Sequence, residues 1–197
     1  MLSNQVDDMF SDSLSIQNNH RAKTYTISFR IEAKNFEKLQ QEAHTQGLSA
    51  NSLINQILND YFEWFIFQRK IGFVPLLKPV VKEIFNKMSK EQVMQIANIG
   101  KEEGTNALYF MKGKIDLDCF LSWFEDRMKN SSIEVRNTFD HTSRMHTYVV
   151  KHDICENWSL YLKEIIEHIF KEILERKVDT TALQSTLTFK FKQQDDC

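Results

Sequence analysis

The chain has 197 residues and a formal net charge of −2, which predicts one or two domains and excludes a globally basic nucleic-acid binder. Three Cys without a CxxC pair exclude a disulfide framework and favour a reducing compartment. No long apolar window and no signal-peptide pattern occur, so we expect a cytoplasmic protein with no membrane partner.

The first thirty residues change in charge along the chain. Residues 1–19 are rich in Ser, Asn, Gln and Asp without a sustained period, which predicts a disordered arm. Residues 20–30 then contain Arg21, Lys23 and Arg30 and no acid. This local basic stretch is the first indication of an anionic partner.

An alternating segment follows from Thr24 to Ile31. One face carries apolar side chains and the other carries mainly small polar ones with Arg30. Period-two alternation predicts a β-strand. A single strand cannot satisfy its own backbone hydrogen bonds, and the next expected strand is far along the chain. We therefore expect a second copy of the chain to supply the partner strand.

Two helices are expected next. The first contains Phe36, Leu39 and Ala43 at helical spacing and ends at Gly47. Ser49 is a plausible N-cap of the second. That second helix has an apolar stripe too wide for one small partner helix, which again suggests a second chain; its members are Leu53, Ile54, Ile57, Leu58, Tyr61, Phe62 and Phe65.

Two copies of the strand would form an antiparallel ribbon that fits the major groove of DNA. Arg30 can read guanine, and small hydroxyl side chains offer donors and acceptors to base edges. The start of the second helix has free backbone N–H groups that can hold a phosphate.

The strand "TYTISFRI" and the later "GLSANSLINQIL" resemble the ribbon-helix-helix regulators, the group that includes the Arc and Met repressors. The resemblance covers residues 23–65 and implies a module over 20–66. It implies base contacts from Thr26, Ser28 and Arg30. Phosphate contacts are expected from Arg21, Lys23, Ser49, Asn51 and Ser52. The alternative is that Thr24–Ile31 is an edge strand of a larger α+β domain and Arg30 a solvated surface charge.

The rest of the chain is expected to form a helical segment over 73–104 and a domain over 105–192. Pro79 suits a helix start, and Ser89 with Gln92 matches a capping box. Strands are expected over 106–111, 132–139, 145–152 and 183–192, and helices over 116–128 and 156–176. This order predicts a ferredoxin-like sandwich, and an α+β fold for the whole chain.

The domain also contains a His and Cys cluster. His146, His152 and Cys155, with His141 as a conceivable fourth member, are ligand types that suit zinc, nickel or copper. The combination of modules and the run "HDIC" resemble the nickel-responsive members of the family. However, if Cys155 matches their ligand Cys, their paired His ligands fall on Thr147 and Val149. The alternative is half-buried strand histidines and a core thiol.

These patterns predict a cytoplasmic, dimeric, sequence-specific DNA-binding regulator, such as a repressor, with a C-terminal sensing or oligomerisation domain. Association of two dimers is left open. A protein-interaction module such as an antitoxin, which also binds DNA, is the alternative. We do not expect an enzyme, because no GxSxG, HExxH or Walker-type motif occurs.

Overall fold

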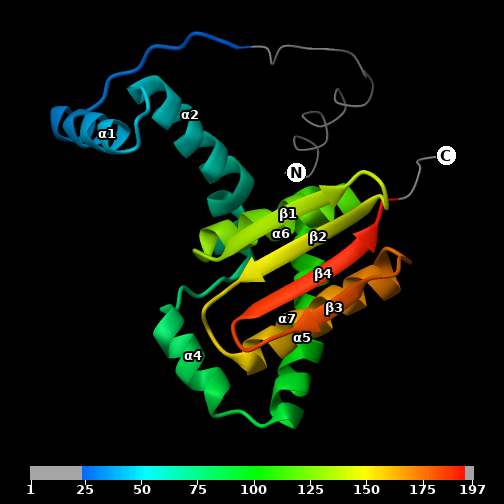
Figure 1. Ribbon diagram of the computed structural model, residues 1–197. Coiled ribbons are helices and arrows are strands. Elements are labelled where there is room, and N and C mark those ends of the chain that lie inside the picture. Colours follow the sequence, from blue (N-terminus) through cyan, green and yellow to red (C-terminus); the bar gives the residue numbers. More distant parts are fainter. Residues whose placement is uncertain (1–23, 194–197) are drawn as a thin grey trace, which may run out of the picture. The chain divides into compact units, whose positions relative to one another are not determined.

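The computed structural model describes residues 24–193 (Figure 1). The chain divides into two units, residues 1–53 and 54–197, and each is described by itself. The arm expected over residues 1–19 lies outside the described residues.

The first unit contains a non-helical segment over 24–32, helix α1 (Ala33–Thr45) and the start of helix α2 (Ala50–Asp60). Its buried apolar residues are Ala43 and Leu53. Both predicted helices are therefore present, and Gly47 separates them as expected.

The helix that starts at Ala50 continues beyond the predicted module. A π-helical turn, η2 (Tyr61–Phe65), joins α2 directly to α3 (Ile66–Ile71). Gly72 ends α3 with φ of +83°, a left-handed conformation that favours glycine. Trp64 is 5% exposed and belongs to the core of the second unit. The predicted module end at residue 66 thus falls inside a continuous helical stretch.

The predicted helical segment contains α4 (Lys78–Asn86) and α5 (Lys90–Lys112), and α6 (Leu117–Asn130) follows. The capping box at the start of α5 is confirmed. The Ser89 side chain accepts from the Gln92 N–H at 3.3 Å, and the Gln92 side chain accepts from the Ser89 N–H at 2.8 Å. This reciprocal pair satisfies two N–H groups that the helix start leaves open.

The strand predicted over residues 106–111 is wrong, because these residues belong to α5. Gly104, Ala107 and Leu108 are buried, whereas Tyr109 and Phe110 are exposed. Burial at positions i, i+3 and i+4 is helical spacing. A short apolar run does not distinguish a strand from a buried helix face.

The sheet has four antiparallel strands in the order β1-β2-β4-β3. They are β1 (Glu134–Asp140), β2 (Met145–Lys151), β3 (Asp179–Ala182) and β4 (Thr186–Lys192). Helix α7 (Glu156–His168) and the π-helical turn η3 (Ile169–Ile173) connect β2 to β3. The α+β class is confirmed. The predicted ferredoxin-like order is not found, because its opening strand is helical and β3 is an additional strand.

Helices α5, α6 and α7 lie behind one face of the sheet (Figure 1). Alternate strand residues on that face are buried, among them Tyr148, Leu187, Phe189 and Phe191. Tyr148 stacks on Phe189 with 4.8 Å between ring centroids. The described part of the chain contains no helix that combines the length and apolar character needed to span a membrane.

Candidate nucleic-acid interface

The alternating segment before α1 keeps its apolar side chains exposed. Ile27, Phe29 and Ile31 are 72%, 60% and 42% exposed. The segment does not belong to the four-stranded sheet. Within the described residues it is therefore not an edge strand of the α+β domain. Three large apolar side chains on one face of a short segment are left uncovered by the single chain.

The polar side chains alternate with these apolar ones. Thr26, Ser28 and Arg30 are all exposed. Among residues 24–193 no carboxylate forms an ion pair with Arg30, whereas nearby Lys34 pairs with Glu32 at 3.1 Å. The Arg30 guanidinium therefore keeps its donors available for an external acceptor.

The turn between α1 and α2 has the geometry of a Schellman motif. Gly47 has φ of +66°, and its N–H donates to the His44 carbonyl at 3.1 Å. The Leu48 N–H donates to the Ala43 carbonyl at 2.8 Å. These two bonds satisfy carbonyls at the end of α1 and fix the direction in which the chain leaves it.

The three residues predicted to hold phosphate lie together where α2 starts. The Ser49 side chain accepts from the Ser52 N–H at 3.0 Å, and the two hydroxyl oxygens are 2.8 Å apart. Asn51 and Ser52 are exposed in the first turn, which contains no acidic residue. The positive end of the helix dipole is thus not neutralised by a local carboxylate.

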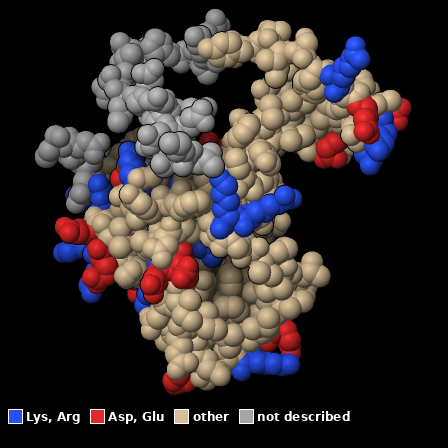
Figure 2. Space-filling view, turned by 180° about the vertical axis from the view of Figure 1, so that it is seen from behind, with Lys and Arg blue, Asp and Glu red and all other residues tan. Residues whose placement is uncertain are grey.

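Charged side chains elsewhere on this unit are of both signs. Figure 2 shows Lys, Arg, Asp and Glu gathered together at one end of the molecule, and α1 itself contains Lys34, Glu37, Lys38 and Glu42. The helix surface of α1 therefore offers no uniform positive patch. Arg21 and Lys23, the other expected phosphate contacts, lie outside the described residues.

The candidate metal ligands have a different environment. His152 is fully buried, and both ring nitrogens already have partners within the protein. Its Nδ1 accepts from the Ile154 N–H at 3.1 Å, so Nε2 carries the proton and donates to Ser159 Oγ at 2.7 Å. The Ser159 hydroxyl in turn donates to the Leu183 carbonyl. Burial lowers the pKa of His152 to about 4, with a smaller opposing effect of Asp153.

His146 lies near the other end of β2. Its ring stacks on Phe191 with 5.0 Å between centroids, and Nδ1 is 3.3 Å from Asn137 Oδ1. Six residues of strand separate it from His152, a span of about 20 Å. These two histidines cannot bind one metal ion together.

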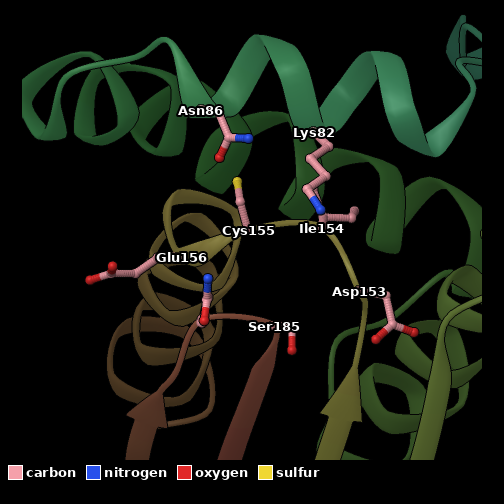
Figure 3. A pocket seen from close by; sticks show the side chains of 8 residues that line it. Lys82, Asn86, Asp153, Ile154, Cys155, Glu156 and Ser185 are labelled. Carbon is pink, nitrogen blue, oxygen red and sulfur yellow. The ribbon is translucent and has the colours of Figure 1, made fainter.

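Cys155 is buried at the start of α7 and lines an open cavity of about 510 Å³. In Figure 3 its sulfur points toward Asn86 of α4, and Lys82 reaches from the same helix toward Ile154. His152 does not line this cavity. Within residues 24–193, no three His, Cys, Asp or Glu side chains are grouped so that they could hold a metal ion. The structure does not bring the three predicted ligands into one site.

Comparison with known proteins gives no match: no family model, no curated protein and no solved structure matches this chain.

Proposed function

We propose that the protein is a DNA-binding transcriptional regulator that acts as a homodimer through an antiparallel ribbon made of two copies of Thr24–Ile31. The observation that carries the proposal is the exposed apolar face of this segment, Ile27, Phe29 and Ile31, directly before two helices joined by a capped turn. A second copy would cover that face and complete the backbone hydrogen bonds of the strand.

The exposed apolar stripe of the following helix supports the same partner. Ile57, Leu58, Tyr61, Phe62 and Phe65 are all exposed in the single chain. Contiguous exposed apolar surface of this kind is typical of a protein interface. A helix that continues from the ribbon module would bring this stripe to the same dimer contact.

Opposite the apolar face, the ribbon would present Thr26, Ser28 and Arg30 twice to the major groove. The start of α2, with Ser49, Asn51 and Ser52, would hold a phosphate on each side. Such anchors fix the position of the ribbon but read no bases.

The second unit supports a sensing or oligomerisation domain rather than a tail that folds on binding a toxin. It has its own core, which includes Trp123, Phe170 and Phe189. Segments that fold on binding are poor in such residues.

The dimer test uses two adjacent substitutions of the full chain. Phe29→Asp places a charge on the apolar face and should convert the dimer to a monomer in analytical ultracentrifugation. Ser28→Asp places the same charge on the opposite face and should leave the dimer intact while abolishing DNA binding. If both variants sediment as the wild type does, the ribbon does not hold the dimer together.

The DNA test uses an operator selected from genomic fragments. Arg30→Ala should weaken binding by about 1–3 kcal/mol and relax the preference at one base pair. Ser52→Ala should weaken binding evenly across sequences. Lys38→Ala, which removes one positive charge from α1, is the control for a general charge effect. An Arg30→Ala protein that binds the selected site as tightly as the wild type would contradict the proposed base contact.

A further inference from the structure

The second unit contains an apolar cavity of about 480 Å³, separate from the cavity beside Cys155. It is lined by α3, the segment 72–77, α4, the end of α6 and α7. Small-molecule sites in proteins commonly have volumes of about 300–1,000 Å³. Most of its lining is aromatic or aliphatic, including Trp64, Phe73, Phe85, Ile133 and Trp158.

The charged lining residues of this cavity are both cations. Lys78 and Arg127 line it, and no Asp or Glu does. Among the described residues neither cation forms an ion pair with a carboxylate, although comparable partly buried lysines of the same unit do. Lys101 pairs with Glu164 at 3.1 Å, and Lys112 with Asp126 at 3.5 Å. A cavity with two such cations and no acid favours an anion.

Both cations are positioned at the end of α6. Lys78 Nζ donates to the Ser132 carbonyl, and the Ser131 N–H donates to the Arg127 carbonyl at 3.1 Å. The ammonium group has three donors, so one carbonyl leaves two for other acceptors. The Arg127 guanidinium carbon is 5.3 Å from the centroid of the Trp123 ring, which orients the group without using its N–H donors.

A further donor of this cavity's lining has no acceptor. Trp158 Nε1 is buried, and no described residue accepts its hydrogen bond. The ring is held against Phe85 and Tyr161, with centroid distances of 4.8 and 5.2 Å. A buried indole N–H normally finds a partner, and a ligand oxygen could supply one.

We propose that this cavity binds a small amphipathic organic anion. Its aliphatic or aromatic body would lie against Trp64, Phe73 and Trp158, and its carboxylate would accept from Lys78 and Arg127. The proposal goes beyond DNA binding and does not depend on it, because every residue named here belongs to the second unit.

The experiment uses the full chain and ω-bromododecanoate below its micelle concentration, because a bromine atom quenches tryptophan fluorescence on contact. Trp64 and Trp158 line the cavity, and Trp123 is the third and last Trp of the chain. We expect saturable quenching, and ω-bromododecanol should need an about tenfold higher concentration, since it lacks the charge-assisted hydrogen bonds.

Three variants test the anion site. Lys78→Met and Arg127→Met keep an apolar stem and should each raise the midpoint for the acid toward that for the alcohol, with the alcohol midpoint unchanged. Lys82→Met, on the same helix but lining the other cavity, should behave as the wild type. Equal quenching of wild type by acid and alcohol would overturn the proposal without any variant. Unsaturable quenching, or an equal effect of Lys82→Met and Lys78→Met, would also overturn it.

Discussion

Replacement of His152 by Gln tests the buried hydrogen-bond chain that connects β2 to α7. The imidazole accepts from the Ile154 N–H and donates to Ser159, whose hydroxyl donates to the Leu183 carbonyl. The glutamine side chain has a donor and an acceptor but cannot take up a proton in the acidic range. At pH 7 imperfect replacement of the two hydrogen bonds should cost about 1–3 kcal/mol of unfolding free energy.

The larger consequence is a change in pH dependence. The pKa of His152 is about 4 in the folded protein, against an ordinary value of 6.5. The unfolded chain therefore binds more protons between these values, so stability is present above pH 6.5 and decreases as the pH falls toward 4. Linkage over this difference amounts to about 2.5 kcal/mol lost by pH 4.5, and to about 3 kcal/mol at lower pH.

The assay is urea unfolding followed by tryptophan fluorescence at pH 7 and pH 4.5. All three Trp residues belong to the second unit, so the signal reports on the unit that contains His152. The wild type should lose about 2.5 kcal/mol more than His152→Gln does between the two pH values. His141→Gln, an exposed histidine in the β1–β2 turn, is the control and should keep the wild-type dependence. Parallel losses in wild type and His152→Gln would refute the reasoning.

Two further predictions concern helices of the second unit and are measured by urea unfolding. A Cβ at Gly100 would lie 2.7 Å from the Tyr161 hydroxyl, whereas at Gly104 it would meet no atom within 4 Å. Gly100→Ala should therefore destabilise by about 1–3 kcal/mol and Gly104→Ala stabilise by about 0.5–1 kcal/mol; the opposite order would contradict the packing of α5 on α7. Asp116 accepts from the Cys119 N–H at 2.8 Å as N-cap of α6, so Asp116→Ala should cost about 1 kcal/mol at pH 7. Its pKa is lowered to about 2, first by the hydrogen bond from Lys114, so the stabilisation is present above pH 3.8 and lost toward pH 2; equal effects at pH 7 and 2 would contradict this.

Local signals in the sequence predicted most of the elements correctly. Gly47, Ser89 with Gln92, and the alternation over β1, β2 and β4 each depend on neighbouring residues, and each is found in the structure. These features are set by backbone hydrogen bonds and by which face is buried, both of which act over a few residues. Helix and strand content could therefore be predicted without knowledge of the tertiary fold.

The errors arise where burial depends on distant residues. The run 106–111 is apolar enough for a strand, but Ala107 and Leu108 pack inside as one face of α5. Strand β3 is short and polar, and it exists because it pairs with β4. The cations Lys78 and Arg127 are 49 positions apart in the sequence, and only the fold brings both to one cavity. No local pattern marks such a site.

The same distinction bears on the histidines. Spacing along the sequence placed His146, His152 and Cys155 within ten positions, but an extended strand separates its ends more than any other regular structure does. A strand therefore rarely gathers ligands from both its ends, whereas a hairpin or a helix can. The apolar face of residues 27–31 differs in kind: its neighbours within the described chain leave it exposed, and a second copy supplies an identical strand. That is why the dimer test with Phe29→Asp and Ser28→Asp bears directly on function, while the ligand test on Lys78 and Arg127 can be decided with the second unit in any oligomeric state.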